Sequence, residues 1–388
     1  MEKVRLGSQI KQIRGISYKP TDLHNDLNDN SVILLRANNI SDGKLNFDDV
    51  VYVDKSKVKE EQYLKKGDIL VCASSGSKEL VGKAAFVKKD FTATFGAFCK
   101  LIRPMGCIAE YLGHYFNSPT YREKISALAL GANINNIRNE HIDELFVCFP
   151  NELEQKSIAS LLDKVTNLID KRKEQLSKLD ELVKARFVEL FGDPMTNSNG
   201  YVLKKYGDLF ELNAGGTPSK QKSEYWDIGT ISWSGSNMCQ NTVIYENDGN
   251  YITEEGLKHS SARMFPVDTV LIALVGATIG KTALLKFETT TNQNVLGVRG
   301  IRESGYTPEF IFHYTQGLYQ KFLNIGDGGF AMASKGFISE LPVPVVDLAL
   351  QEQFAAFVEQ TDKSKLELQK SLEKLELLKK ALMQKYFG

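Results

Sequence analysis

Two stretches of the chain, residues 151–192 and 347–388, show the spacing of long amphipathic helices. Apolar residues in the first stretch recur at alternating steps of four and three, at Ile158, Leu162, Val165, Ile169, Leu176, Leu179, Val183 and Leu190. The second stretch keeps the same register from Phe354 to Tyr386, and each stretch ends at a glycine, a common helix stop. Because a period of 3.5 residues is typical of coiled coils, we expect two long helices that pack against each other.

The two helical stretches are copies of each other. Gln155 corresponds to Gln351, Leu176 to Leu372 and Phe191-Gly192 to Phe387-Gly388. Each stretch follows an apolar run that contains proline, ending at Pro150 in the first copy and spanning residues 341–345 in the second. Since a repeat of this length indicates a duplicated structural unit, the segments before the helices are also expected to correspond.

The globular segments repeat more loosely, as short β-branched strands separated by Gly, Asn and Asp turns. Residues 6–10 correspond to residues 206–210, and residues 67–71 to residues 267–271. The sequence therefore predicts an α+β protein with a pseudo-two-fold internal repeat. The expected segments are a mixed α/β domain over 1–150, a long helix over 151–192, a second mixed α/β domain over 193–346 and a second long helix over 347–388.

A helix of about 38 residues is roughly 57 Å long. If the two helices pack antiparallel, they place one globular domain at each end, and two such domains suit a ligand with two binding elements. DNA fits this description best, because its half-sites recur about every 34 Å or a multiple of that distance. The plainer alternative is a helical hairpin that only holds the chain together.

The composition permits DNA binding without demanding it. The net charge is zero, whereas non-specific DNA-binding proteins are usually basic, so local patches and partner subunits would have to attract the phosphates. The five cysteines form no C-x-x-C pair, which argues against a disulfide framework and a zinc site. No segment has the apolar length of a membrane span, and the first residues do not resemble a signal peptide. We expect a reduced, cytoplasmic protein that does not enter membranes.

Residues 276–282, Gly-Ala-Thr-Ile-Gly-Lys-Thr, resemble a phosphate-binding P-loop but are one residue short of its spacing. The corresponding turn near Lys83 has another spacing, and Ala84 follows the lysine where a P-loop has a hydroxyl residue. We therefore predict a β-hairpin in which Thr278, Lys281 and Lys83 can face a phosphate. A nucleotide-dependent enzyme built on this turn remains the alternative.

Residues 213–220, Asn-Ala-Gly-Gly-Thr-Pro-Ser-Lys, form the most distinctive stretch. A glycine-rich loop with hydroxyl groups and a lysine suits a phosphate, so Thr217, Ser219 and Lys220 are candidate contacts. We interpret Trp226 and Trp233, which follow, as core residues.

Polar amide and basic side chains also lie just before the apolar strand that leads into each long helix. Asn and Arg are residue types that read base edges in DNA, although Asn and Gly also favour turns for local reasons. The remaining candidate DNA contacts are Arg14, Tyr18, Lys19, Arg36, Asn38, Ser75, Lys78, Asn135, Asn136, Arg138, Ser234, Asn237 and Lys335.

Motifs of common enzymes are missing from the sequence. The chain contains no H-E-x-x-H, no G-x-S-x-G and no Pro-Pro-Tyr or Pro-Pro-Trp of the type found in amino-methyltransferases. The five histidines are scattered. We therefore expect no catalytic centre, no metal and no cofactor in this chain.

The repeat, the Gly-Gly-Thr-Pro-Ser-Lys stretch followed by Glu-Tyr-Trp, and the proline-containing exits into long helices together resemble the specificity (S) subunit of type I restriction-modification enzymes. The resemblance covers essentially the whole chain. The first domain departs from the pattern, since residues 14–20, Arg-Gly-Ile-Ser-Tyr-Lys-Pro, stand where the second domain has its glycine-rich loop.

The resemblance implies two target recognition domains that each read one half of a bipartite, asymmetric site in double-stranded DNA. It also implies that the two long helices form an antiparallel coiled coil, which acts as a spacer and docks two modification (methyltransferase) subunits. Restriction (nuclease and translocase) subunits would join the assembly. S-adenosylmethionine, ATP and Mg would then be bound by those partners. Candidate partner-binding residues on the helices are Arg172, Leu176, Leu179, Leu368, Leu372 and Leu375. A coiled-coil adaptor that binds only protein is the second alternative.

Overall fold

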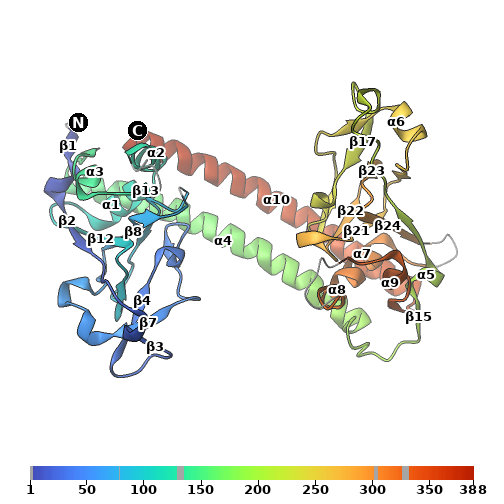
Figure 1. Ribbon diagram of the computed structural model, residues 1–388, viewed down its shortest axis with the longest axis horizontal. Helices are drawn as coiled ribbons and strands as arrows, with labels where there is room; N and C mark the ends of the chain where they lie inside the picture. Colours follow the sequence, from blue (N-terminus) through green and yellow to red (C-terminus); the bar gives the residue numbers. More distant parts are fainter. Residues whose placement is uncertain (1–2, 78, 129–134, 301–304, 326–331) are drawn as a thin grey trace. The chain divides into compact units, whose positions relative to one another are not determined.

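The structure is a computed structural model that describes residues 3–77, 79–128, 135–300, 305–325 and 332–388 (Figure 1). The chain divides into two compact units. One combines residues 1–173 with residues 370–388, and the other comprises residues 174–369. Each unit therefore contains one globular domain together with part of both long helices.

The first globular domain is built from short strands and three short helices. Its strands are β1 (Lys3–Arg5), β2 (Ile10–Arg14), β3 (Leu23–His24), β4 (Ser31–Leu35), β5 (Ile40–Ser41), β6 (Lys44–Leu45), β7 (Val51–Asp54), β8 (Ile69–Cys72), β9 (Ser74–Ser75), β10 (Ala84–Phe86), β11 (Ala93–Phe95), β12 (Cys99–Pro104), β13 (Asn135–Asn136) and β14 (Phe146–Cys148). Its helices are α1 (Ala109–Phe116), α2 (Pro119–Leu128) and α3 (Asn139–Asp143), with 3-10 turns η1 (Leu6–Gln9), η2 (Pro20–Asp22), η3 (Ala37–Asn39), η4 (Lys55–Lys57) and η5 (Glu60–Gln62).

The second globular domain has the same kind of architecture. Its strands are β15 (Leu203–Lys205), β16 (Phe210–Ala214), β17 (Ile231–Ser234), β18 (Thr242–Ile244), β19 (Tyr251–Ile252), β20 (Met264–Phe265), β21 (Val270–Ala273), β22 (Thr282–Leu285), β23 (Thr289–Thr291), β24 (Val295–Gly300) and β25 (Pro342–Pro344). Its helices are α5 (Tyr206–Leu209), α6 (Glu254–Lys258), α7 (Pro308–Gly317), α8 (Tyr319–Leu323) and α9 (Lys335–Ser339), with 3-10 turns η6 (Ser223–Tyr225), η7 (Ser236–Met238) and η8 (Gly276–Thr278). The long helices are α4 (Glu152–Phe191) and α10 (Leu348–Phe387).

The two domains share the order of four strands in the main sheet and one parallel strand pair. The main sheet runs β10-β8-β12-β2 in the first domain and β16-β24-β21-β22-β18 in the second, so the second has one extra edge strand. A smaller sheet contains a parallel pair in each domain, β11 with β4 and β23 with β17. The short ladders β1–β14 and β15–β25 tie the start of each domain to the strand before its long helix. The α+β class and the internal repeat predicted from the sequence are therefore confirmed.

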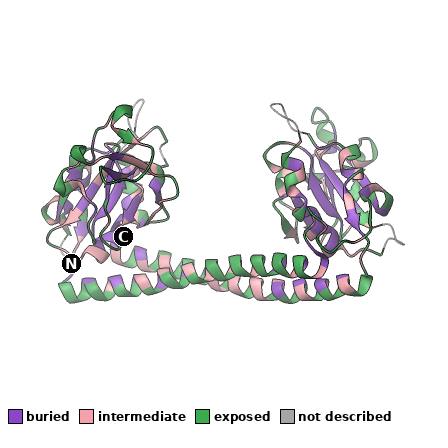
Figure 2. Ribbon diagram, turned by 90° about the horizontal axis from the view of Figure 1, so that it is seen from below, coloured by how far each residue is buried: buried purple, intermediate pink, exposed green. Residues whose placement is uncertain are grey.

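Each main sheet has an apolar layer on both faces because its strands alternate side chains between them. In the first domain, Ile69, Val71 and Ile102 pack with α1, α2 and both long helices, whereas Leu70 and Leu101 pack in a second cluster on the other face. In Figure 2 the strands of each globular domain are mostly coloured as buried. The sheet is thus fixed on the helices by one face, and its edges and loops remain to meet a ligand.

Within each unit, the segments of α4 and α10 run antiparallel. In the first unit, Arg172 Nε donates to Ser371 Oγ at 3.3 Å. In the second unit, Lys365 pairs with Asp180 at 2.7 Å, and the Phe187 ring lies 5.2 Å from the Phe354 ring. The residue numbers on the two helices therefore run in opposite directions, as the sequence predicted.

A buried glutamine joins each domain to the helix that follows it. Gln155 accepts a hydrogen bond from the Ile108 amide at 3.0 Å and donates to the Pro150 carbonyl at 2.8 Å. Gln351 repeats the arrangement, since it accepts from the Thr307 amide at 3.0 Å. The correspondence of the two glutamines in sequence thus reflects one repeated joint.

Candidate nucleic-acid interface

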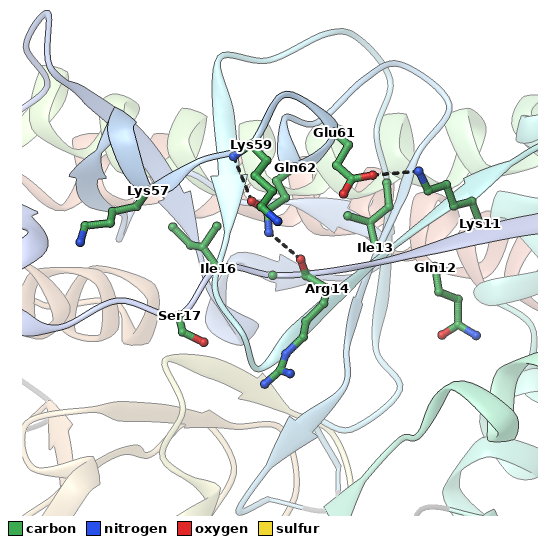
Figure 3. A pocket seen from close by; sticks show the side chains of 11 residues that line it. Lys11, Gln12, Ile13, Arg14, Ile16, Ser17, Lys57, Lys59, Glu61 and Gln62 are labelled. Atoms are coloured by element: carbon green, nitrogen blue, oxygen red, sulfur yellow. Dashed lines mark hydrogen bonds and ion pairs between the residues drawn. The ribbon is translucent and has the colours of Figure 1, made fainter.

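The edge strand β2 of the first domain borders a basic cavity of about 480 Å³. Figure 3 shows side chains from β2 and from the chain around η4 and η5 arranged about this edge. The cavity is lined by Lys11, Gln12, Ile13, Arg14, Gly15, Ile16, Ser17, Lys57, Lys59, Glu61 and Gln62. Its charged side chains are four basic residues and one acidic residue, so the cavity is locally positive although the whole chain is neutral.

Two of these basic side chains already form ion pairs within the protein. Lys11 contacts Glu61 at 2.8 Å, and this hydrogen bond lowers the pKa of the Glu61 carboxyl. Lys57 contacts Asp22 at 3.1 Å. By contrast, Arg14 and Lys59 form no ion pair with any acid in the described part of the chain. These two cationic side chains are therefore available to contact a DNA phosphate or a nucleobase.

The backbone around Arg14 is held firmly. Gln62 Nε2 donates to the Arg14 carbonyl at 2.9 Å, and the Lys59 amide donates to Gln62 Oε1 at 3.0 Å. The next residue must be a glycine, because a Cβ on Gly15 would lie 2.1 Å from the Gly96 carbonyl oxygen. The exposed Arg14 guanidinium thus projects from a rigid strand end, which suits specific recognition.

A lysine that sequence reasoning missed lies beside Arg14. Lys100 on β12 stands opposite Arg14 in the ladder, so both side chains emerge on one face. Its Nζ donates to Asn139 Oδ1 at 2.5 Å and to Gln12 Oε1 at 3.4 Å. Burial lowers the pKa of Lys100 to about 8, although Asp143 nearby opposes the shift. Gln12, Lys100 and Asn139 therefore extend the polar surface around Arg14, and only the strand register could have revealed them.

The glycine-rich loop of the second domain occupies the corresponding place after β16. Gly215 fills the role of Gly15, since a Cβ there would lie 2.1 Å from Thr291 Oγ1. Thr217 Oγ1 donates to Gln293 Oε1 at 2.6 Å, while Ser219 and Lys220 are exposed. The predicted loop is thus formed, with its outer end open to solvent.

The two tryptophans clamp this loop rather than filling the core. Each is half-buried, and their rings lie 5.2 Å apart at 81°. Trp226 Nε1 donates to the Ser219 carbonyl at 3.2 Å, and Trp233 Nε1 donates to the Gly216 carbonyl at 3.4 Å. Our interpretation of both as core residues was wrong, because their indole N–H groups hold loop carbonyls.

Arg263 is a second base that sequence reasoning missed. It is exposed, and its Nη1 donates to Asn213 Oδ1 at the end of β16. Arg263 lies two residues after Ser261, and the backbone of Ser261 closely approaches Gly216. The loop of the second domain therefore has a guanidinium beside it, in a segment that showed no motif.

Several other predicted contacts in the first domain are engaged within the protein. Arg36 pairs with Asp49 at 3.0 Å, and Asn38 Nδ2 donates to the same carboxylate at 2.6 Å. Tyr18 packs at the edge of a small apolar cluster, and Lys83 is half-buried. The remaining predicted residues are Lys19, Asn136 and Arg138, which are exposed, Ser75, whose strand pairs with Asn135 in β13, and Lys78, which lies outside the described residues.

One predicted contact in the second domain is contradicted by burial. Ser234 is 0 % exposed, and its Oγ donates to Asn247 Oδ1 at 3.3 Å. It cannot contact DNA, because its side chain lies on the inner face of β17. The sequence did not show on which face of β17 the Ser234 side chain would lie. Asn237 and Lys335 are exposed.

The P-loop-like residues form a turn between strands, as predicted. β21 and β22 pair antiparallel, and Gly276 and Gly280 adopt positive φ in the turn that joins them. Thr278 donates to the Val275 carbonyl at 3.5 Å, and Lys281 Nζ donates to Gln240 Oε1 at 3.2 Å. The segment leads into a strand, whereas a P-loop leads into a helix whose N-terminus meets the phosphates.

The predicted partner-binding residues lie mainly between the two long helices. Leu372 is buried, and Arg172, Leu176, Leu179, Leu368 and Leu375 are half-buried. Other leucines are exposed, among them Leu161, Leu168 and Leu182 on α4 and Leu366, Leu377 and Leu378 on α10. The open apolar surface of the helices is therefore different from the seam that the sequence indicated.

Two further properties of the described residues bear on function. None of the helices among them has the length and apolar character needed to cross a membrane. Among the same residues, no three or more His, Cys, Asp or Glu side chains gather as metal ligands would.

Known proteins resemble this chain in sequence and in fold. The specificity subunit of the type I restriction enzyme StySPI from Salmonella potsdam is 42 % identical over 173 residues, which span 44 % of this chain and 37 % of that subunit. The S subunit of a type I restriction-modification system from M. genitalium has the same fold, with a TM-score of 0.60, 16 % identity and coverage of 100 % of this chain and 96 % of that one.

A third similarity is to a structure described as the basis of complex assembly and conformational transition of the type I R-M system. It has a TM-score of 0.57 and 15 % identity over 99 % of this chain and 97 % of that one. The family described as type I restriction modification DNA specificity domain matches twice, over residues 3–181 and 199–379. These two matches take in most of the chain, one on each repeat, and the chain belongs to this family.

Proposed function

We propose that this chain is the DNA-recognition subunit of a type I restriction-modification complex and has no catalytic centre of its own. The observation that carries the proposal is the pair of globular domains, which share the strand order of the main sheet but present unlike polar loops. Arg14 and Lys59 dominate the first loop region, whereas Thr217, Lys220 and Arg263 surround the second. Two unlike readers on one scaffold suit a bipartite, asymmetric site in double-stranded DNA.

The partners belong to the same proposal. Two modification subunits would dock on the long helices, and restriction subunits would join them. The exposed leucines at 161, 168 and 182 favour the outer face of α4 for this docking, since apolar side chains there are open to a partner helix. We further propose that S-adenosylmethionine, ATP and Mg are held by those partner subunits.

Reconstitution tests this function against its alternatives. The chain assembled with its modification subunits should retain a duplex that contains its target in the presence of excess random DNA, because base contacts add specificity to phosphate contacts. Equal retention of both duplexes would contradict sequence recognition. An assembly that retains no DNA would favour the protein-only adaptor, and ATP binding by the isolated chain that Lys281→Ala abolishes would favour the nucleotide-dependent enzyme.

A further inference from the structure

Ile228 is the most exposed large apolar side chain among the described residues, at 99 % of its full accessibility. Its backbone has a φ of 52°, in the left-handed region that β-branched residues strongly disfavour. The other non-glycine residues with positive φ in the described chain are all Asp or Asn, which tolerate this conformation. Neither burial nor backbone preference therefore accounts for an isoleucine at this position. Strained residues often mark functional sites.

The chain is anchored immediately before Ile228. The amides of Trp226 and Asp227 both donate to the Ser223 carbonyl at 2.8 Å, which closes the turn. The Trp226 ring packs against Trp233 and is hydrogen-bonded to the loop carbonyl of Ser219. The approach to Ile228 is thus rigid and is linked directly to the glycine-rich loop.

The chain is also anchored immediately after Ile228. Gly229 lies so close to β19 that a Cβ would come within 2.6 Å of the Ile252 carbonyl carbon. One residue earlier than Trp226, the Tyr225 carbonyl accepts from the Thr253 amide at 2.9 Å. Ile228 is therefore held out from the domain between two fixed points. An apolar side chain presented in this way loses little freedom when it is covered.

The surroundings of Ile228 favour DNA as the ligand that covers it. Ser219 and Lys220, proposed above as phosphate contacts, belong to the loop that Trp226 holds. Lys222 adds a second cation, whose Nζ lies 2.9 Å from the Tyr225 hydroxyl. DNA-binding proteins that deform the duplex insert apolar side chains such as isoleucine between base pairs, while nearby Lys and Arg side chains contact the DNA.

We propose that Ile228 is a wedge that enters a base step of the DNA and partly unstacks it when the second recognition domain binds. The proposal rests on the DNA-recognition function proposed above. It gives the second domain a means of sequence discrimination besides hydrogen bonding, because flexible steps unstack more readily than stiff ones.

Fluorescence of 2-aminopurine, which brightens when its base unstacks, tests the wedge. Target duplexes that carry the probe at one purine at a time are bound by the full chain assembled with its modification subunits. The native chain should brighten one step of the half-site, in addition to the base that a methyltransferase extrudes for modification. Ile228→Asn places a residue that tolerates the left-handed backbone at this position and removes the apolar side chain. This variant should lose the fluorescence increase at the unstacked step and keep the increase at the base extruded for methylation. It should also weaken binding about tenfold.

Ile228→Leu should keep the signal, and Val202→Asn is the matched control, since Val202 is another exposed β-branched residue of the second domain. An unchanged profile with Ile228→Asn, while the complex still selects its target, would overturn the wedge and leave the proposed function intact. Loss of subunit assembly with Ile228→Asn would place Ile228 in a protein contact and also overturn the wedge. Failure of the native complex to select any sequence would instead overturn the proposed function.

Discussion

Arg14 and Lys59 share one cavity but should differ in what they contribute to binding. Arg14 ends a braced strand, so its guanidinium can form the paired hydrogen bonds that distinguish guanine. Lys59 lies on the neighbouring loop as a flexible point charge, which suits a phosphate.

The corresponding substitutions should separate these roles. Arg14→Ala should reduce discrimination at one position of the site by about 1–3 kcal/mol. Lys59→Ala should weaken binding to all sequences and lower the salt dependence by about one counterion. Competition binding at several salt concentrations measures both, with the paired Lys57 as the control substitution. Equal loss of specificity in Arg14→Ala and Lys59→Ala would contradict the assignment.

Lys100 should make DNA binding depend on pH. Burial lowers its pKa to about 8, so its charge is present at lower pH and is lost as the pH rises through this value. If this charge supports binding, affinity should fall between about pH 7 and 9, and Lys100→Met should remove that dependence. The stability of the folded chain should depend on pH in the opposite direction to DNA affinity. The unfolded chain keeps the proton up to the ordinary lysine pKa of 10.5, so the free energy of unfolding should rise from pH 8 to 10.5.

At this scale the sequence predicted residue types better than residue positions. Arg14 and Thr217 were predicted because they lie in corresponding stretches of the two copies, whereas Lys100 and Arg263 depend on which strands and loops meet. Ser234 failed because one residue in a strand decides whether a side chain faces in or out. Arg36 and Asn38 carry suitable donors, but Asp49, thirteen or fewer residues away, already accepts from both.

Among the elements, the joint formed by Gln155 and Gln351 explains why each domain is fixed to its helix. Each amide satisfies a backbone donor and a backbone acceptor where the domain meets its helix, and both glutamine side chains are themselves buried. Such groups are costly to leave unpaired.

Removal of either amide should therefore destabilise the protein. Gln155→Ala or Gln351→Ala should lower the free energy of unfolding by about 1–3 kcal/mol, measured by chemical denaturation. Gln353→Ala, at an exposed position two residues beyond Gln351, should have little effect. A similar loss in all three variants would show that the buried hydrogen bonds are not the cause.

The helices themselves were readable because their apolar period is long and regular. The seam from Leu162 to Val183 is buried or half-buried as predicted. Near the C-terminal ends of the two helices the buried side chains are instead Phe187, Phe191, Met383 and Phe387. An α-helix turns every 3.6 residues, so a strict 3.5-residue register drifts out of line with the buried face.

For the whole molecule, the repeat is the feature that ties fold to function. Equivalent strands, glycines and glutamines build one scaffold twice, and the polar loops differ between the copies. The sequence was sufficient to predict this organisation because duplication shows directly in the spacing of residues. It could not predict the cavity beside Arg14 or the exposed Ile228, since both depend on tertiary contacts.

The most direct test of two unlike DNA readers is a map of the bases methylated by the chain reconstituted with its modification subunits. The account predicts methylation within two short, different sequence elements at a fixed separation. Deletion of residues 193–347 should abolish the dependence on one element. Methylation scattered without regard to sequence, or unchanged selectivity after the deletion, would contradict it.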